Sequence, residues 1–587
     1  MAPLVYLARR MSSPVEPNLP TGPRWLAPLL CALVGLAWGV YLVGRSTIDP
    51  TSVEWMLSGD WAPPLFGWLY SREAPWGLPL GQAPGYLYPV GTSLAYTDGT
   101  PWLGTFFKVL SPVLPRTFQV HGLWLALCFL LQGFFGARIV ACLSPRPLHQ
   151  LLGGALFVLS PTLNMRMGHL SLCSHWLVLA LLWLNLRPCP DARTAHRSLG
   201  LALFFVALAA GVHVYLAAMT LTLALALAFR VWRLDRYLAG PLAGAWAAAL
   251  FATPLGMMAL FGYFSSATTP APGFTTYSAN LLTLVDPSGL SRFLPGIPVG
   301  NGQYEGYGYL GLGIIVMGLA VLVALKVKGE KPLVPRSAKP MVIACLLMGL
   351  FALSSAVHLA QIRVVSYRAL FEGVGAPIAQ TFRSPGRFIW PLHYLAVLGA
   401  IAGLLRVLRH RPGWAAGALG LAAAVQALEM PPELCCGSRF APQMQPLPGG
   451  TAAWNLATGD YQHVVLYPPL MVDGAGRGCT TPSFEPHEAA PIGWQAYLSG
   501  MTFNSGYVSR VDAPRVQAYC EQLKQELQQG RFSPDSIYVI HAKAAPDFLA
   551  QAQGRATCGT LDGVLVCVAT EKTGAFRDVL LRQPPPG

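Results

Sequence analysis

The chain has 587 residues, of which 53% are hydrophobic and only 11% are charged, and its formal net charge is +14. Soluble domains carry about 25% charged residues, so this composition excludes an ordinary soluble protein and indicates a polytopic membrane protein. Because basic residues orient membrane spans, the positive charge does not indicate binding to nucleic acid.

Apolar runs that are long enough, or nearly so, to cross a bilayer predict about eleven transmembrane helices. The first run lacks a signal-peptide cleavage pattern and is expected to remain as the first span. With a cytoplasmic N-terminus, every short basic loop lies inside and the C-terminal region lies outside. The two apolar runs on either side of Gly211, at 198–211 and 213–229, are expected to be two short helices. The runs lie at about 25–43, 118–142, 148–163, 170–186, 198–211, 213–229, 238–264, 307–325, 340–359, 388–405 and 413–428.

Acidic residues are spread unevenly, with twelve Asp and Glu in residues 1–428 and fourteen in residues 429–587. This change, at the turn-rich segment "EMPPELCCGS", predicts a transmembrane domain at 1–428 and an external α/β domain at 429–587. In the second domain, "HVVLYPP", "SIYVIHA" and "GVLVCVA" predict strands, and "APRVQAYCEQLKQELQQG" predicts a helix.

The cysteines agree with an external second domain. Six cysteines allow up to three disulfides with fifteen possible connectivities, and disulfides persist in oxidising compartments. The adjacent pair Cys435 and Cys436 is expected to bond to different partners, while six buried free thiols are the alternative. The six of the twelve cysteines that lie in this domain are Cys435, Cys436, Cys479, Cys520, Cys558 and Cys567.

The first external loop, at about 45–117, holds five acids among many aromatic residues. Acids beside a membrane are costly and need a reason. Aromatic rings can stack on the apolar faces of sugars while carboxylates accept hydrogen bonds from hydroxyls, so the loop suits sugar binding. An aromatic belt at the membrane interface is the alternative. The residues singled out in this loop are Asp60, Trp61, Trp68, Arg72 and Asp98.

Three further motifs carry polar residues at the external ends of the apolar runs. In "AQTFRSPGRFIWPLHY", Arg383 and Arg387 suit phosphate, because a guanidinium makes paired charged hydrogen bonds, although nonspecific binding to lipid headgroups is the alternative. "GQYEGYGYLGLG" contains Tyr304 and Glu305, which could contact a sugar or acceptor or be structural. In "NMRMGHLSLCSHW", His169 lies six residues before the next histidine, a poor spacing for a shared metal, so no metal site is predicted.

Together, these segments resemble the C-type glycosyltransferase superfamily, the membrane enzymes that use lipid-phosphate sugars. The resemblance covers most of the membrane part and suggests a bacterial branch of the superfamily. It implies that an acid of the first external loop is the catalytic base, which matches Asp60, with Asp49 and Asp98 as rivals. The chain lacks an Asp-x-Asp pair and a Trp-Trp-Asp motif, so no cofactor is required, and a divalent cation such as Mg²⁺ or Mn²⁺ is not favoured. The motifs that carry the resemblance are "GDWAPPLFGWLYSREAPWGLPLG", "YTDGTPW", "NMRMGHLSLCSHW", "GQYEGYGYLGLG" and "FRSPGRFIWP".

The resemblance also implies partners and a place in the cell. The partners would be a polyprenyl-phosphate sugar, the bilayer and a glycan or protein acceptor, with no nucleic acid. The protein would lie in the bacterial inner membrane, with its C-terminal domain in the periplasm. The donor phosphate would be held by Arg383, Arg387 or Arg72, and the sugar or acceptor by Glu305, Trp61, Trp68, Tyr304 and His169. A lipid-linked sugar transporter or flippase, or a non-catalytic partner in polysaccharide assembly, is the alternative.

Overall fold

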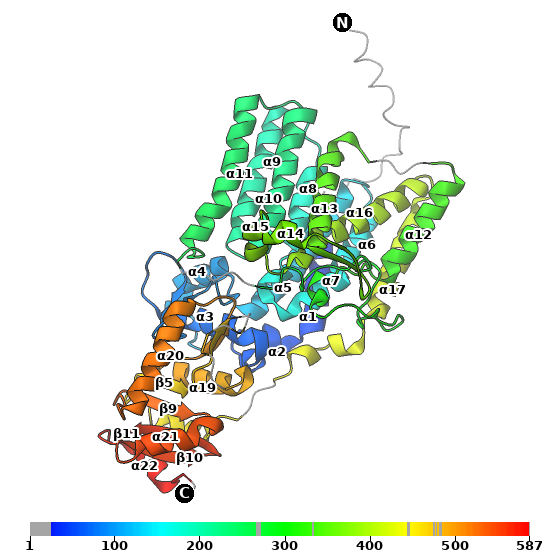
Figure 1. Ribbon diagram of the computed structural model, residues 1–587. Helices are drawn as coiled ribbons and strands as arrows, with labels where there is room; N and C mark the ends of the chain where they lie inside the picture. The colour runs from blue at the N-terminus through cyan, green and yellow to red at the C-terminus, as the bar shows by residue number, and fades with distance from the viewer. Residues whose placement is uncertain are drawn as a thin grey trace.

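The structure is a computed structural model that describes residues 25–265, 272–330, 334–442, 446–473, 476, 478–479 and 484–585. A helical part occupies one end of the molecule, and a smaller part that contains a sheet occupies the other (Figure 1). The first long loop, which holds helices α2 to α4, lies between them.

Each of the eleven predicted apolar runs contains a helix of the helical part. Five described segments are long and apolar enough to cross a membrane, namely Leu26–Val43, His121–Ala141, Val214–Leu234, Gly240–Leu260 and Pro385–Val407. The total of about eleven spans, and their orientation, stay predictions. The helices are α1 (Leu26–Val43), α5 (His121–Ala141), α6 (Pro147–Val158), α7 (Pro161–Met165), α8 (Trp176–Leu186), α9 (Ala192–Ala210), α10 (Val214–Phe229), α11 (Gly240–Leu260), α12 (Leu312–Val327), α13 (Lys339–Ala352), α16 (Trp390–Val407) and α17 (Pro412–Glu429).

The expected break between two short helices is present at Gly211, where α9 ends and α10 follows. A Cβ atom at Gly211 would lie 2.2 Å from the ring of Trp102, which comes from the first long loop. The backbone N–H of Trp102 donates to the carbonyl of Gly211 at 3.0 Å. The glycine is therefore needed because the loop packs directly onto the bend.

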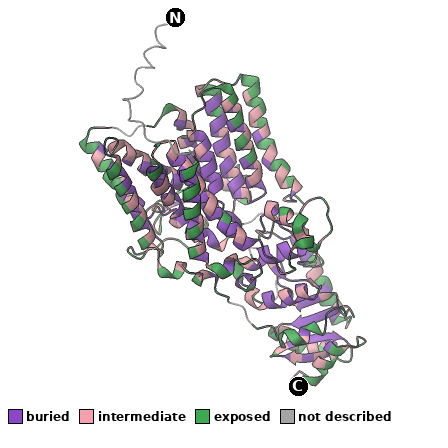
Figure 2. Ribbon diagram, turned by 180° about the vertical axis from the view of Figure 1, so that it is seen from behind, coloured by how far each residue is buried: buried purple, intermediate pink, exposed green. Residues whose placement is uncertain are grey.

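Close packing at glycines joins α1 to α5. A Cβ atom at Gly35 would lie 2.1 Å from the carbonyl oxygen of Phe129, and one at Gly133 would lie 2.1 Å from that of Cys31. Small residues that let backbones approach are typical of helix pairs in membranes. On the outer helices, by contrast, exposed residues run along the surface (Figure 2), and those of α12 and α13 are largely Val, Leu and Ile. A bilayer would solvate such a surface.

One predicted run is only partly helical. The run at 340–359 forms α13 up to Ala352, but its last residues form the strand β3 (Ala356–Leu359), which pairs with β4 (Ile362–Ser366). Val, His and Leu suit a strand as well as an apolar helix, so composition alone did not separate the two. The short helices α14 (Arg368–Glu372) and α15 (Ala376–Thr381) follow this hairpin.

The first long loop is a packed layer. It contains α2 (Arg45–Ile48), α3 (Ala62–Glu73), α4 (Pro101–Leu110) and a small hairpin of β1 (Gln82–Ala83) and β2 (Thr92–Ser93). All residues of α3 from Ala62 to Arg72 are buried. Helix α3 is covered on one side by the C-terminal part, whose α19 contacts it.

The C-terminal part is a mixed five-stranded sheet with helices. Its strand order is β10-β11-β9-β5-β7, with β5 parallel to β9 and β7 and the other pairs antiparallel. The three predicted strands and the predicted helix are confirmed as β5, β9, β11 and α20. A separate parallel pair joins β6 to β8. The elements are α18 (Gly450–Asn455), β5 (His463–Tyr467), β6 (Met471–Asp473), α19 (Pro486–Leu498), β7 (Thr502–Phe503), β8 (Gly506–Val508), α20 (Ala513–Gln528), β9 (Ser536–Ile540), α21 (Ala545–Ala552), β10 (Ala556–Leu561), β11 (Val564–Ala569) and α22 (Ala575–Arg582).

Polar contacts fasten the first long loop to this C-terminal part. The guanidinium of Arg116 donates to the carbonyls of Leu498 and Tyr497, both at 2.8 Å. The backbone N–H of Tyr88 donates to the carbonyl of Phe503 at 3.0 Å. The hydroxyl of Tyr70 donates to the carbonyl of Met501 at 3.0 Å. The two parts therefore meet through hydrogen bonds, of which that of Tyr70 is buried, as well as through apolar packing.

Two disulfides lie in the C-terminal part, Cys479–Cys520 and Cys558–Cys567. The expectation that Cys435 and Cys436 bond to different partners is wrong in this structure. Their sulfur atoms lie 2.6 Å from each other, and neither bonds to another cysteine. The reason is that both lie on the segment that leads out of α17 and is held against the end of α1, away from the sheet. Cys436 there donates its N–H to the carbonyl of Tyr41 at 2.9 Å.

We predict that the two disulfides differ in their effect on stability. Cys479 and Cys520 are 41 residues apart, whereas Cys558 and Cys567 are only 9 apart on adjacent strands. A longer closed loop restricts the unfolded chain more, so the first bond should contribute about 1 kcal/mol more than the second. Thermal unfolding of the two double cysteine-to-alanine variants would measure this. A larger loss in the Cys558→Ala/Cys567→Ala variant would contradict it.

Candidate active site

Short turns bring the predicted polar residues together at one end of the helical part. Asp60 lies in the turn Gly59–Trp61, and His169 follows the turn Arg166–Gly168. Glu305 lies in the turn Gln303–Gly306, and Arg387 in the turn Pro385–Ile389. Such turns have few repeating backbone hydrogen bonds, so the side chains themselves must help to fix their arrangement.

Glu305 is the centre of a buried ion triad. Its carboxylate accepts two hydrogen bonds from Arg387, both at 2.9 Å, and one from Arg166 at 2.7 Å. The side chains of Arg166 and Glu305 are only 3% and 5% exposed. Burial alone would raise the pKa of Glu305, but the guanidinium groups of Arg387 and Arg166 override this effect and hold the pKa well below its usual range. Glu305 is therefore ionised.

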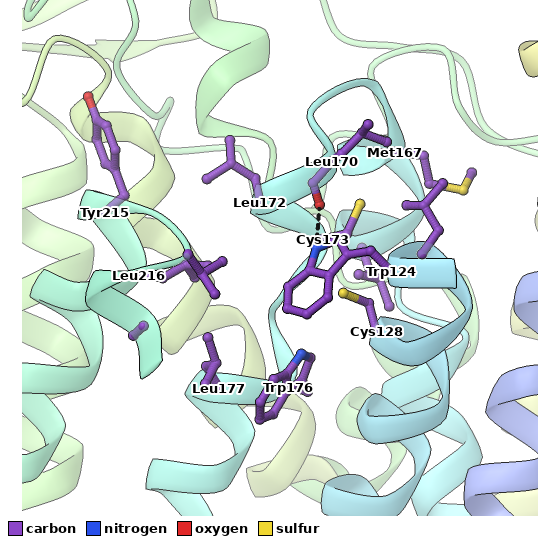
Figure 3. Close-up of a cluster of buried hydrophobic side chains, with 14 of the residues drawn as sticks. Trp124, Cys128, Met167, Leu170, Leu172, Cys173, Trp176, Leu177, Tyr215 and Leu216 are labelled. Carbon is purple, nitrogen blue, oxygen red and sulfur yellow. Dashed lines mark hydrogen bonds between the residues drawn. The ribbon is translucent and has the colours of Figure 1, made fainter. Parts of the chain in front are cut away.

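Arg166 also binds backbone atoms and an aromatic ring. Its guanidinium donates to the carbonyl of Tyr304 at 2.8 Å and lies 5.4 Å from the ring centre of Trp390. The segment that carries Arg166 rests on a buried apolar cluster (Figure 3). In this cluster, the indole N–H of Trp124 donates to the carbonyl of Leu170 at 3.2 Å. The core of the helical part thus positions the triad.

His169 connects this buried triad to the surface. Its Nε2 atom lies 3.9 Å from a carboxylate oxygen of Glu305 and 3.9 Å from one of Asp60. The Asp60 side chain is 49% exposed, and that of His169 is 33% exposed. The Asp60 carboxylate is therefore accessible to a ligand, and His169 lies near both it and Glu305.

Asp98 belongs to the same electrostatic cluster but lies in a different environment. It accepts a hydrogen bond from the hydroxyl of Ser171. Burial raises the pKa of Asp98, and the charge of Asp60 adds to this, although His169, Ser171 and Arg387 oppose it. Asp98 is therefore the more buried of the two aspartates and is held by Ser171, whereas Asp60 faces solvent.

Arg383 and three tyrosines, Tyr277, Tyr304 and Tyr507, belong to the same electrostatic cluster as Asp60. The guanidinium of Arg383 lies 5.0 Å from the ring centre of Tyr277 and has no hydrogen bond or ion pair with any other residue that the structure describes. Tyr507 comes from β8 of the C-terminal part. Burial raises the pKa of Tyr507 to about 12, with a further contribution from the charge of Asp60 and an opposing one from Arg383. Tyr304 responds to the same two charges, so these residues form one cluster.

Two residues predicted from the sequence, Trp68 and Arg72, lie away from the cluster, whereas Trp61 lies next to it. The ring of Trp68 is fully buried, and its indole N–H donates to the carbonyl of Phe118 at 2.7 Å, so a sugar cannot reach it in this structure. Arg72 lies at the far end of α3, roughly 18 Å from Asp60 by helix rise, and its guanidinium is occupied by backbone carbonyls such as that of Pro115. These two residues support the core instead. Trp61 is partly exposed beside Asp60 and stacks on Phe440 at 5.0 Å.

Four residues of the cluster were not predicted from the sequence. Arg166 had a usable signal, because it is a basic residue in a loop predicted to be external, where the positive-inside rule does not explain it. His213 begins α10 and accepts the N–H of Tyr215 at 3.2 Å. Burial and the charges of Arg387 and His169 hold the pKa of His213 well below its usual value. Neither Tyr277 nor Tyr507 lies in a motif that indicates a site.

The fold and the site define a protein with apolar spanning helices, a C-terminal α/β part and a charged cluster where the two meet. The chain belongs to the DUF6311 family, described as a domain of unknown function, whose family model matches residues 32–431. The model for the DUF6311 C-terminal domain matches residues 453–569. No curated protein matches the chain. Among solved structures, the chain is similar to the crystal structure of ArnT from Cupriavidus metallidurans bound to undecaprenyl phosphate, with 11% identity, 93% of this chain and 98% of that chain covered, and a TM-score of 0.44.

We predict that the Glu305 triad is a main source of stability. In a Glu305→Gln variant, the guanidinium groups of Arg166 and Arg387 would stay buried without a counterion, which typically costs about 3–5 kcal/mol. Glu73→Gln is a matched control, because Glu73 pairs with Arg116 at 3.1 Å with both side chains more than 40% exposed, and it should cost less than about 1 kcal/mol. Thermal unfolding in detergent would compare them.

The pH dependence of the same variants gives a second readout. A carboxylate whose pKa is lowered by folding stabilises the protein above its unfolded pKa, and this contribution is lost as the pH falls towards the folded pKa. The wild type and Glu305→Gln should therefore differ most at neutral pH and converge in acid. Equal stability of the two proteins at pH 7 would show that the triad does not hold the fold.

Proposed function

We propose that the protein is an integral-membrane glycosyltransferase that moves a sugar from a polyprenyl-phosphate donor to a hydroxyl of a cell-envelope acceptor. One observation carries this proposal. An accessible carboxylate, Asp60, lies in one cluster with the guanidinium of Arg383, which has no hydrogen bond or ion pair with any described residue and is two residues before the candidate span Pro385–Val407. A base beside a cation at the end of a span suits a reaction on a lipid phosphate.

The reaction requires a base and a charge acceptor. Asp60 would take the proton of an acceptor hydroxyl, and the oxygen would attack the anomeric carbon of the donor. The new carbon–oxygen bond forms as the bond to the lipid phosphate breaks, with inversion at that carbon. Phosphate is a good leaving group and needs no general acid, but its charge needs stabilisation, which Arg383 would supply.

The environments of the remaining residues suggest their roles. Arg387 is committed to Glu305, so it would shape the site instead of taking the donor phosphate, which leaves Arg383 as the phosphate ligand. Asp98 is partly buried and already accepts a hydrogen bond from Ser171, so it would hold a substrate hydroxyl in place, whereas the exposed Asp60 would take the proton. Tyr304, His169 and Trp61 lie close enough to Asp60 to contact the sugar or acceptor.

The proposal includes a location and a set of partners. The reaction would take place at the periplasmic face of the bacterial inner membrane, where the polyprenyl-phosphate sugar is presented by the bilayer. The acceptor would be lipopolysaccharide, another glycan or an exported protein. Neither a divalent cation nor a nucleic acid is needed for the steps above.

Two aspartate variants should separate the base from its rival. A positioned base contributes about 10²–10⁴-fold, so Asp60→Asn should lower transfer by that factor. Its thermal stability should stay nearly unchanged because the side chain is half exposed. Asp98→Asn keeps an acceptor for Ser171 and tolerates the left-handed backbone at this position, where φ is 59°. It should lose about tenfold or less. Transfer from radiolabelled polyprenyl-phosphate sugars to membrane extracts is the measurement, and full activity of Asp60→Asn would refute the assignment.

A third variant tests the phosphate ligand. Loss of a charged hydrogen bond costs about 1.5–3 kcal/mol, so Arg383→Gln should raise the KM for the lipid donor roughly 10- to 100-fold. Arg368→Gln is a matched control on α14, because Arg368 is exposed and outside the cluster. A donor KM that changes equally in both variants would exclude a specific role for Arg383.

A further inference from the structure

A cavity lies between the first long loop and the C-terminal part. Its volume is about 160 Å³, and its lining includes Gln82, Ser93 and Tyr96 from the loop and Val508 and Arg515 from the C-terminal part. An engineered cavity of about 150 Å³ in another protein holds a benzene molecule. The cavity is therefore large enough for one six-membered ring.

Two residues that line this cavity carry polar atoms whose hydrogen-bonding capacity is unused. The side-chain nitrogen of Gln82 and the hydroxyl of Ser93 are buried and have no hydrogen-bond partner among the described residues. Buried polar groups are nearly always hydrogen-bonded, so rotation of these two side chains toward the cavity would let them bind the hydroxyl groups of a ligand. Leu87, Val90 and Val508 supply an apolar surface on the same wall. A ring that has hydroxyls around its edge and apolar faces, as a pyranose has, matches both features.

Three connections place the cavity beside the active-site cluster. On β8, Val508 lines the cavity while its neighbour Tyr507 responds to the charges of Asp60 and Arg383, as expected for adjacent residues on opposite faces of a strand. In the first loop, Tyr96 lines the cavity two residues before Asp98.

The third connection runs through Arg510, which also lines the cavity. Its guanidinium donates to the carbonyls of Gln380 and Thr381, at 3.3 and 3.5 Å, directly before Arg383. The same segments of the chain therefore border both the cavity and the cluster.

We propose that this cavity binds one pyranose unit of a glycan acceptor, next to the unit that receives the new sugar. This inference rests on the proposed function. All lining residues belong to the first long loop, to the C-terminal part or to Ser265 after α11, and none belongs to a candidate span. The occupant therefore comes from the aqueous side, whereas the donor lipid would bind at Arg383. The acceptor is then a glycan and not a protein.

The test uses the full-length protein in nanodiscs without a donor. Saturation-transfer NMR with glucose, galactose, mannose and N-acetylglucosamine would detect pyranose binding. Ser93→Ala and Gln82→Met remove the two unpartnered groups with little change in volume, and each should weaken binding at least about tenfold. Gln522→Met, on the exposed face of α20, is the matched control and should bind as the wild type does. Retention of the wild-type melting temperature would show that the variants are folded.

Two results would overturn the inference. The first is that no pyranose binds to the wild type, as expected for a cavity that holds only water. The second is that the wild type and both variants bind a pyranose equally well.

Transfer assays separate this inference from the proposed function. If Asp60→Asn abolishes transfer while Ser93→Ala and Gln82→Met leave the acceptor KM unchanged, the glycan subsite is wrong and the transferase stands. If a pyranose binds in the expected pattern but no lipid-linked sugar is transferred, the subsite stands and the transferase is wrong.

Discussion

The carboxylate of Glu305 is the constraint on which the rest of the site depends. Two guanidinium groups are buried beside it, and buried charges are tolerated only when they are paired and hydrogen-bonded. Arg166 is 139 residues away in the sequence and Arg387 is 82 residues away. The triad therefore joins three distant turns at one point. One of these turns leads into α16 and another is followed by His169, so this buried contact helps to fix the position of His169 near Asp60.

The ion pairs among the described residues of the cluster leave one guanidinium uncommitted. Arg166 and Arg387 are both paired with Glu305, whereas Arg383 has no ion pair with any described residue. An anionic ligand at Arg383 would therefore not displace the existing ion pairs of the triad.

Much of the helical part could be predicted from hydrophobic runs, since each run contains a helix. The strands of the C-terminal part were equally readable, because β-branched residues fill them. The environments of individual side chains could not be predicted from the sequence. Trp68 and Arg72 appeared as aromatic and charged residues of an external loop, yet α3 is buried because α19, more than four hundred residues later, packs on it. Such a contact leaves no local signal.

The two arginines of the motif "FRSPGRFIWP" show the same limit more sharply. By spacing they are equivalent, since both lie before the same apolar run. The structure distinguishes them through Glu305, which accepts two hydrogen bonds from Arg387 and none from Arg383. Only the fold of residues 303–306 against 385–389 decides which guanidinium remains available. The sequence singles out the segment, and only the tertiary contact distinguishes its two arginines.

The C-terminal part has a larger share in the site than its position in the chain suggests. Tyr507 lies on the side of the cluster where Asp60 and Arg383 act, and it comes from a strand pair, β6 with β8, that is separate from the main sheet. The main sheet and its helices thus act as a support, while this strand pair faces the helical part. Since Arg116 and Tyr70 hold the same interface together by hydrogen bonds to residues 497–501, the helical part alone would lack one wall of its own cluster. The two parts therefore form one functional unit.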